Sequence, residues 1–199
     1  MTMKKVRLTT ECDNSCESRI GGGAFIGGIV DWPKTANGED LTLIASICGE
    51  MLIPVLGHIA KGKYVSVFSY YSAKDYFLDE ITYHGDQDEL DYIYKNHTTK
   101  VLVHEKGDLI QKGCLIKPML IKQNGEVTDT KFFCGSGFGG APNFLQIRDI
   151  SFEDKTFVLQ LYSGDYPEPY RDIFGLSDAV GYLHINKDFN GGLFFTQTT

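Results

Sequence analysis

The sequence predicts an α+β protein that is mostly β, with two related β-rich halves packed into one globular unit and few helices. Three observations predict this class. Short runs of β-branched and aromatic residues recur along the chain and are bounded by Gly, Pro, Asn or Asp, as strands usually are. Only one segment has a strong helical pattern. A short glycine motif occurs twice, at Ser18–Gly22 and at Ser136–Gly140.

The length of 199 residues suits a single domain over 1–199, whose halves we place at roughly 17–110 and 111–199. A chain of this size buries enough surface to fold without a metal or a disulfide. Apolar side chains make up 42% of the residues and aromatic ones 13%, which excludes a disordered or fibrous protein.

Eight runs are expected to form strands. They are Leu41–Ile47, Tyr64–Tyr71, Lys100–His104, Cys114–Ile121, Lys131–Cys134, Thr156–Tyr162, Val180–Ile185 and Leu193–Gln197. Asn124-Gly125 predicts a hairpin turn after Met119–Ile121, because Asn and Gly tolerate the positive φ of a tight turn. Asn37-Gly38 predicts a similar turn.

One helix is expected to begin at Asp86. Asp86 and Glu89 have the spacing of a capping box, and acids in a first turn also complement the helix dipole. The side chains that follow at i, i+3, i+4 and i+7 are Leu90, Ile93, Tyr94 and His97. A second, weaker helix is predicted over Gly49–Ala60, with Pro54 inside it.

The two glycine motifs precede similar successions of elements. Each is followed by a strand, then by a loop that contains proline, and then by another strand. Two related halves would account for this order, with the glycines supplying positive φ or a close approach of neighbouring chain.

The net charge of the chain limits which classes of partner are expected. Lys and Arg total 19 against 26 Asp and Glu, which gives a net charge of −7. This sign repels phosphate backbones and anionic lipid surfaces, so neither nucleic acid nor a membrane is an expected partner. The longest apolar run is too short for a membrane span, and no leader opens the chain. We therefore expect a cytoplasmic protein.

The five cysteines have no regular spacing. They are Cys12, Cys16, Cys48, Cys114 and Cys134. Without a secretion signal they are expected to be reduced thiols. Cys12 and Cys16 are at the edge of zinc-ligand spacing, but no second pair of ligands is close in sequence, so no metal or other cofactor is expected. Whether these two cysteines bind a metal is left open.

The glycine-rich segment 135–140 follows Cys134, and its amides could in principle form an oxyanion pocket. The histidines are not tied to this thiol by spacing, and the segment lacks the Lys-Ser/Thr of a phosphate-binding loop. No catalytic residue is therefore predicted.

The sequence indicates a surface for a protein partner more strongly than it indicates a catalytic site. The segment Asp165–Tyr170 combines prolines that stiffen a loop, tyrosines that offer contact area and acids that suit a basic partner. The candidate partner-binding residues are Asp165, Tyr166, Glu168, Tyr170, Asp172, Asp79 and Glu80. Tyr70-Tyr71, Tyr76-Phe77 and Tyr83 form a second aromatic, acid-flanked region. The alternative in both places is that the tyrosines pack on the body of the protein.

The order and spacing of several motifs, from Glu17 to the C-terminus, resemble the YwqG-like family, a bacterial domain of unknown function. The motifs are Ser18–Gly22, Asp31-Trp32-Pro33, Asn37-Gly38, Leu41–Ala45, Gly62–Tyr71, Asp75–Phe77, Phe138–Pro142, Gln146, Phe157–Leu161, Val180–Asn186 and Gly192–Gln197. The chain departs from the family at Gly23-Ala24, where x-Pro is frequent, and at Ser46, where Gln is usual.

The resemblance implies a β-rich, internally duplicated fold and no established catalytic residues. Members of such families are sometimes immunity proteins beside bacterial toxins. We therefore expect a non-catalytic protein-binding module, an immunity protein that occludes a basic toxin or effector domain. The alternative is an enzyme or small-ligand-binding protein that uses a cleft between the halves, with Cys134, His104 or His184 as reactive groups. A scaffold without an avid partner is a third hypothesis.

Overall fold

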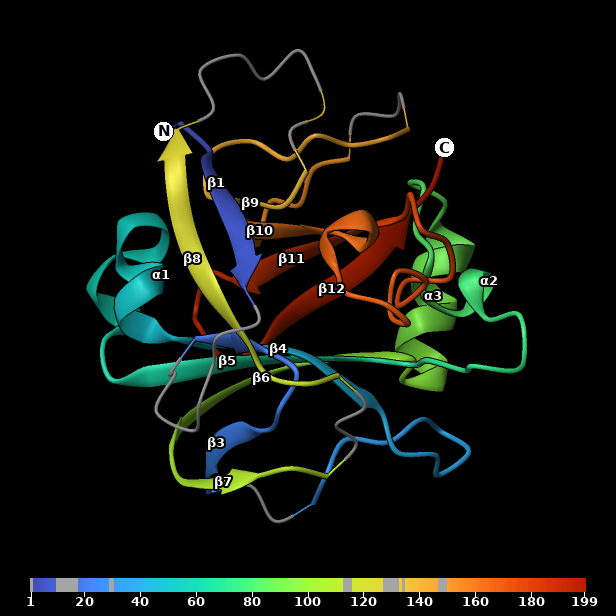
Figure 1. The fold of residues 1–199 in the computed structure, drawn as a ribbon, viewed down its shortest axis with the longest axis horizontal. Coiled ribbons are helices and arrows are strands. Elements are labelled where there is room, and N and C mark those ends of the chain that lie inside the picture. The colour runs from blue at the N-terminus through green and yellow to red at the C-terminus, as the bar shows by residue number, and fades with distance from the viewer. Residues whose placement is uncertain are drawn as a thin grey trace.

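The structure is a computed structural model that describes residues 2–9, 18–28, 31–112, 116–126, 133, 135–146 and 150–199. In these ranges the chain is mostly β with few helices, which confirms the predicted fold class. The strands form one antiparallel sheet of twelve, in the order β12-β11-β10-β9-β1-β8-β2-β4-β5-β6-β3-β7 (Figure 1).

The elements have the following bounds. The strands are β1 (Lys4–Thr9), β2 (Arg19–Ile20), β3 (Ala24–Gly27), β4 (Thr42–Cys48), β5 (Lys63–Ser69), β6 (Thr99–Lys106), β7 (Asp108–Ile110), β8 (Met119–Glu126), β9 (Gly137–Phe138), β10 (Lys155–Tyr162), β11 (Val180–Asn186) and β12 (Gly192–Gln197). The helices are α1 (Gly49–Leu56), α2 (Leu78–Ile81) and α3 (Gln87–Asn96), with short 3₁₀ helices η1 (Gly57–Ala60) and η2 (Ser163–Asp165).

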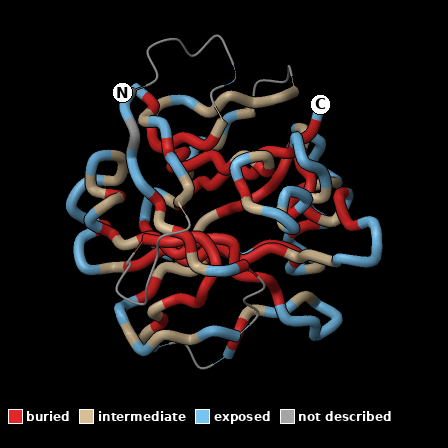
Figure 2. Tube along the Cα trace, in the orientation of Figure 1, coloured by how far each residue is buried: buried red, intermediate tan, exposed pale blue. Residues whose placement is uncertain are grey.

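The sheet curls until its end strand β12 lies beside β6. At that place the hydroxyl of Thr99 donates a hydrogen bond to the carbonyl oxygen of Phe194, 2.7 Å away. The main core is enclosed by this curl, and it combines Ile44 and Val65 of the first half with Leu183 of the second. Figure 2 shows the buried residues concentrated where the strands face one another.

Two further apolar clusters lie on the outer faces of the sheet. Tyr83 and Ile93 pack with Phe195 between α3 and strands β10–β12. Trp32 packs with Phe68 beneath β4 and β5. Each half of the sheet is therefore covered on both faces, and this accounts for its nearly continuous apolar strands.

The halves are interlocked through the N-terminal strand. β1 pairs with β8 on one edge and with β9 on the other, while β2 pairs with both β8 and β4. A strand from the start of the chain thus completes the sheet of the second half.

The repeated serines make matching hydrogen bonds. The hydroxyl of Ser18 accepts the N–H of Cys48, which ends β4, at 3.0 Å. The hydroxyl of Ser136 accepts the N–H of Tyr162, which ends β10, at 2.9 Å.

The glycines of the two motifs also adopt matching conformations. The φ angles are +58° and +68° at Gly21-Gly22, and +69° and +70° at Gly139-Gly140. These correspondences favour the predicted duplication, which stays a prediction.

Both predicted helices are present. α3 begins after Asp86, whose carboxylate accepts the N–H of Asp88 at 3.0 Å. Glu89 does not complete a capping box, because its carboxylate accepts the backbone N–H of His84 and meets the His84 ring. α1 and η1 together cover the predicted segment Gly49–Ala60. The short helix α2 was not predicted.

The hairpin predicted at Asn124-Gly125 is wrong. β8 continues through these residues and pairs with β1 on both sides of them, with a register shift between Lys4 and Val6. Gly125 has a φ of +70°. One common type of β-bulge places a glycine in this conformation. Asn124-Gly125 therefore marks a bulge in β8 and not the predicted hairpin turn. Asn37-Gly38 does form a turn, in which the Gly38 N–H bonds the carbonyl of Thr35.

Candidate functional site

The fold brings two acidic segments together. The loop over residues 163–178 lies against residues 71–78, where the hydroxyl of Tyr71 donates to the carboxylate of Asp172 at 3.4 Å. A Cβ atom on Gly175 would lie 3.3 Å from the Cα atom of Leu78, so the two backbones are close. We call the resulting surface the acidic tyrosine face. It consists of Glu39, Tyr70, Tyr71, Asp75, Tyr76, Asp79, Glu80, Tyr92 and Asp172.

The aromatic part of the face is anchored by Phe77. This ring is 4% exposed and meets Tyr70 and Tyr71 edge to face, with ring centroids 6.0 and 5.4 Å apart. Edge-to-face packing fixes the orientation of the two tyrosine rings. α2 follows directly, burying its apolar residues and directing Asp79 and Glu80 outward.

Tyrosine hydroxyls and carboxylates are paired across the face. Tyr76 donates to Asp79 at 3.2 Å, and Tyr92 donates to Glu80 at 2.7 Å. The hydrogen bond to Glu80 and partial burial raise the pKa of Tyr92. Burial, followed by the carboxylates of Glu39 and Glu80, raises the pKa of Tyr70. The phenols of Tyr70 and Tyr92 therefore stay protonated donors at neutral pH.

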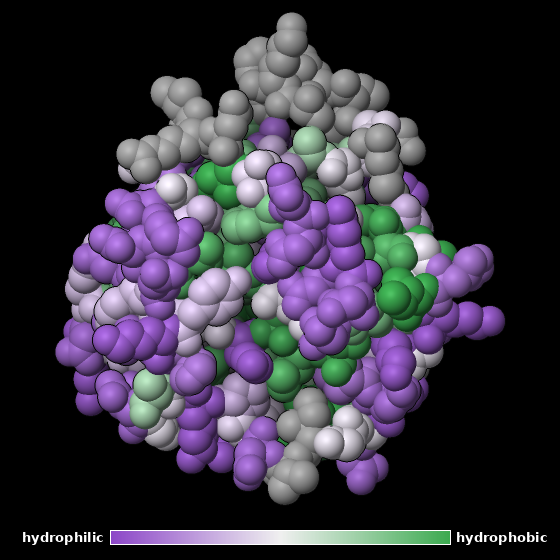
Figure 3. Space-filling view, turned by 180° about the vertical axis from the view of Figure 1, so that it is seen from behind, coloured by the Kyte–Doolittle hydropathy of each residue, from purple (hydrophilic) through white to green (hydrophobic). Residues whose placement is uncertain are grey.

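The carboxylates of the face form no ion pair with any Lys, Arg or His that the structure describes. Within the described ranges, every ion pair involves other acids, such as Lys34 with Asp40 and Arg171 with Glu168. In the view from behind (Figure 3), the left-hand side, where α2 and α3 lie, is mostly hydrophilic. Five carboxylates gathered on one side create a local negative field.

A small cavity of about 150 Å³ opens within the face. Its lining includes Glu39, Tyr70, Glu80, Tyr92, Asn37 and Asn96. Glu39 comes from the loop before β4 and Glu80 from α2, so the two carboxylates reach the cavity from separate elements. Charged and polar acceptors of this kind suit an ammonium or guanidinium head.

The predicted partner-binding residues are divided by the structure. Asp79, Glu80 and Asp172 lie on the acidic tyrosine face. Tyr166 does not lie on any surface: it is 1% exposed and packs edge to face on Phe174 in the core. The prediction that Tyr166 contacts a partner is therefore wrong, because burying its ring in the core stabilises the fold instead.

The other residues of the predicted loop lie outside the face. Asp165 is exposed, and its carboxylate accepts the N–H of Ser136 at 3.0 Å, which ties the loop to the glycine segment. Glu168 pairs with Arg171 at 3.5 Å. Tyr170 is half-buried against the core. A role for Asp165, Glu168 and Tyr170 in binding stays a prediction.

Sequence reasoning missed two residues of the face, Glu39 and Tyr92. Tyr92 is 41% exposed and lies off the apolar stripe of α3, where an aromatic residue is a recognisable signal. Glu39 gave no signal, because its proximity to Tyr70 depends on how the loop before β4 folds back.

His104 is part of a buried polar chain. Its Nε2 lies 2.8 Å from the hydroxyl oxygen of Ser66, which in turn lies 3.0 Å from the hydroxyl oxygen of Ser46. Burial lowers the pKa of His104. The pair resembles a nucleophile and its base, but Ser66 is completely buried, so it is not placed to attack a substrate.

His184 is buried among aromatic rings, and no described contact joins it to His104. Cys12, Cys16, Cys114 and Cys134 lie outside the described residues. Cys48 is a half-buried free thiol. In the part of the chain that the structure describes, no group of His, Cys, Asp and Glu is arranged to hold a metal ion.

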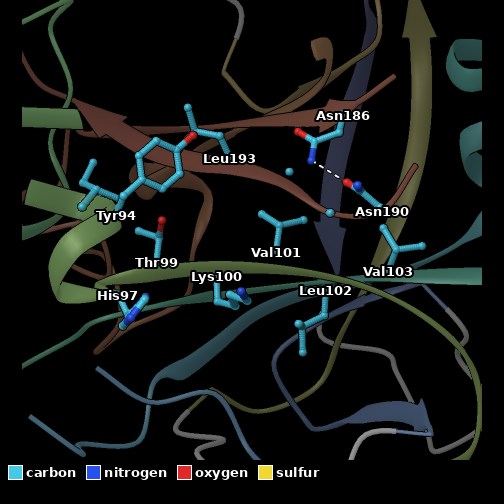
Figure 4. Close-up of a pocket in the computed structure, with 13 residues that line it drawn as sticks. Tyr94, His97, Thr99, Lys100, Val101, Leu102, Val103, Asn186, Asn190 and Leu193 are labelled. Atoms are coloured by element: carbon cyan, nitrogen blue, oxygen red, sulfur yellow. Dashed lines mark hydrogen bonds between the residues drawn. The ribbon is translucent and has the colours of Figure 1, made fainter. Parts of the chain in front are cut away.

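A second, larger cavity of about 270 Å³ lies between the halves. Its walls are the end of α3, the edge of β6 and the turn between β11 and β12 (Figure 4). We call it the seam cavity. Neither His104 nor His184 lines it, so the predicted reactive histidines are not in this cleft.

Comparison with known proteins adds no family: no family model and no curated protein matches the chain. The resemblance to the YwqG-like family stays a prediction. None of the helices in the described ranges has both the length and the apolar composition that crossing a membrane requires.

Proposed function

We propose that this chain is a non-catalytic module that binds a basic protein through the acidic tyrosine face, and that it acts as an immunity protein by occluding a toxin. The proposal depends on one observation: five carboxylates that form no ion pair with a described residue lie among four tyrosine rings. Such a surface speeds the encounter with a basic partner by electrostatic attraction. Its aromatic rings then slow dissociation by burying contact area.

The cavity between Glu39 and Glu80 supplies a specific contact. A Lys or Arg side chain of the partner would place its charged head among two carboxylates and the Tyr92 hydroxyl. Charge-assisted hydrogen bonds of this type are stronger than neutral ones and are directional, so they favour one orientation of the partner.

Two double variants of equal net charge test the site. Asp79→Asn with Glu80→Gln removes charge from the face, whereas Asp108→Asn with Glu153→Gln removes the same charge from exposed positions elsewhere. Titration of each isotope-labelled protein with a short arginine-rich peptide, followed by NMR, gives affinity and location. We expect the first variant to bind about tenfold more weakly and the second to bind almost as the parent does. Equal losses in both would show that only total charge matters, and would refute the site.

The immunity role makes a stricter demand. One equivalent of the protein should abolish the activity of its basic toxin, and the Asp79→Asn, Glu80→Gln variant should do so only at a higher concentration. Peptide binding on the face without inhibition of any basic toxin would keep the binding site but remove the immunity role.

A further inference from the structure

The small cavity of the acidic tyrosine face has walls that hydrogen bonds hold together. The loop before β4 is tied to the end of α3, where the N–H of Ala36 donates to the carbonyl oxygen of Asn96 at 2.8 Å. The N–H of Tyr70, just after β5, donates to the carbonyl oxygen of Thr98 at 2.7 Å. The hydroxyl of Thr98 in turn donates to the carbonyl oxygen of Glu80 in α2. The walls are therefore in position before a ligand arrives, which lowers the entropic cost of binding.

Two pairs of a phenol and a carboxylate line this cavity. The hydroxyl of Tyr92 donates to the carboxylate of Glu80 at 2.7 Å, and the hydroxyl of Tyr70 donates to the carboxylate of Glu39. The charge of Glu80 also acts on the hydroxyl of Tyr70, so the two pairs are neighbours. Each phenol uses its single hydrogen in its pair, whereas a carboxylate can accept at about four positions. The pairs therefore offer spare acceptors and no spare phenol hydrogen.

The rest of the lining adds little positive character. The hydroxyl of Thr98 is used by the carbonyl oxygen of Glu80, and the side-chain nitrogen of Asn96 donates to the carbonyl oxygen of Tyr92 at 3.1 Å. Among the described residues, no Lys, Arg or His lines the cavity. A lining with an excess of charged acceptors complements a cation that carries several hydrogen-bond donors.

A guanidinium group meets these acceptors better than an ammonium group does. It is planar and has five N–H donors in a fixed arrangement, so one head can bond the carboxylates of both Glu39 and Glu80. Its flat faces also stack on aromatic rings, and Tyr70 and Tyr92 line the same cavity. An ammonium group has three donors around one compact, strongly hydrated charge, so it loses more hydration on entering the cavity.

We propose that this cavity selects an arginine side chain of the partner over a lysine side chain. The guanidinium group bridges Glu39 and Glu80, which are the residues that bind it. Tyr70 and Tyr92 are positioning residues, because each holds one of these carboxylates by a hydrogen bond. The inference rests on the function proposed above, since it names the residue type that the acidic tyrosine face recognises in a basic partner.

NMR titration of the isotope-labelled full chain with three short peptides tests this selection. The peptides are acetyl-Gly-Arg-Gly amide and the same peptide with Lys or with citrulline in place of Arg. We expect the arginine peptide to bind about fivefold more tightly than the lysine peptide, with shifts centred on Glu39, Glu80 and Tyr92. The citrulline peptide has nearly the shape of the arginine peptide but no charge, and we expect no binding.

The outcomes separate this inference from the proposed function. Equal or tighter binding of the lysine or the citrulline peptide would overturn the selection of arginine. Failure of all three peptides to bind, while the arginine-rich peptide still binds the face, would also overturn it and would leave the proposed function in place. If the arginine-rich peptide does not bind the face either, the proposed function fails as well.

Two neighbouring carboxylates of α2 provide matched variants. Asp79 and Glu80 both lie on the face, but only Glu80 lines the cavity. Glu80→Gln should remove most of the preference for arginine over lysine, whereas Asp79→Asn should weaken both peptides by the same factor and retain the preference. Glu39→Gln, in an exposed loop, should act as Glu80→Gln does. A preference that survives both glutamine variants, or that Asp79→Asn abolishes, would refute the selection by this cavity.

Tyr92→Phe tests the positioning role. This variant keeps the ring and removes the hydroxyl that holds Glu80. The ratio of the two affinities should fall toward one, by about twofold, because Glu80 is no longer fixed for a bidentate contact. A general disturbance of the face would instead weaken the arginine and lysine peptides equally, and that result would contradict the role given to Tyr92.

Discussion

His184 illustrates how burial alone changes the chemistry of one side chain. Its ring stacks on Phe195 with centroids 5.6 Å apart and meets Phe157 edge to face. Its Nδ1 is buried and has no hydrogen-bond partner among the described residues. Burial lowers the pKa of His184 to about 3, and the positive charge of Lys155 adds to the lowering. The imidazole is therefore held neutral, as part of an aromatic cluster.

This burial predicts a pH dependence of stability. The pKa of His184 is lower in the folded than in the unfolded protein, so protonation of this histidine favours unfolding. The stability that comes from the neutral, buried ring is therefore fully present above about pH 6.5 and is lost as the pH falls toward about 3. Between pH 7 and about pH 4.5 the loss is about 2–3 kcal/mol. Urea unfolding at both pH values should show this loss in the parent protein and a smaller one in His184→Gln. The exposed His58→Gln serves as the control, and a parent-like slope in His184→Gln would contradict the assignment.

Tyr166 gives a second prediction for a single residue. Its hydroxyl is buried and has no hydrogen-bond partner among the described residues, and burial raises its pKa well above the usual value. Tyr166→Phe removes the unpaired hydroxyl and keeps the ring, so the free energy of unfolding should rise by about 1 kcal/mol. Denaturant unfolding measures it. A loss of stability would mean that the hydroxyl has a partner.

At the scale of elements, the turn after β2 depends on close approach of two backbones. A Cβ atom on Gly22 would lie 2.2 Å from Pro118 Cβ, and the φ of Gly22 is +68°. Gly62 has a similar φ of +73°, but a Cβ there would meet nothing within 4 Å. Comparing substitutions at the two glycines therefore distinguishes the cost of a positive φ from the cost of steric overlap.

Alanine at the two positions should have different effects. Gly62→Ala should cost about 1 kcal/mol for the positive φ alone, whereas Gly22→Ala should cost about 3 kcal/mol or more, because the chain must also move away from Pro118. Thermal or urea unfolding of both variants measures the difference. Equal costs would show that the turn adjusts without strain.

Elements were predictable from sequence where local signals and tertiary contacts agree. The helix after Asp86 was predicted because its cap, its acids and its apolar spacing all favour the same segment. The short strands β2, β3 and β9 have too few residues for a periodic pattern, and pairing with distant strands defines them. Asn124-Gly125 shows the limit of turn signals, since a positive φ serves a hairpin or a bulge equally well.

The candidate site depends more strongly on tertiary structure. Asp79 and Glu80 were predicted from their sequence neighbourhood, but Glu39 joins them only because its loop folds back toward Tyr70. The seam cavity could not be predicted at all, since it results from the place where β6 and β12 separate. Tyr166 and Tyr92 show that composition alone does not tell which tyrosine is buried.

At the scale of the whole molecule, the interlocked sheet predicts one cooperative unfolding transition. β1 lies between β8 and β9, and β2 joins β8 to β4, so neither half completes its sheet alone. Amide exchange in denaturant should therefore report the same unfolding free energy for β5, in the first half, and for β11, in the second. A lower unfolding free energy for β5 than for β11, or the reverse, would show that the halves unfold independently.

The single tryptophan has a practical consequence for such work. The indole N–H of Trp32 donates to the carbonyl of Leu41 at 2.8 Å, and its ring meets Phe68 edge to face at 5.0 Å. Its fluorescence thus originates from one defined location, the layer beneath β4 and β5. Any loosening of that layer would change the emission, so the chain contains its own optical reporter for local opening and needs no attached dye.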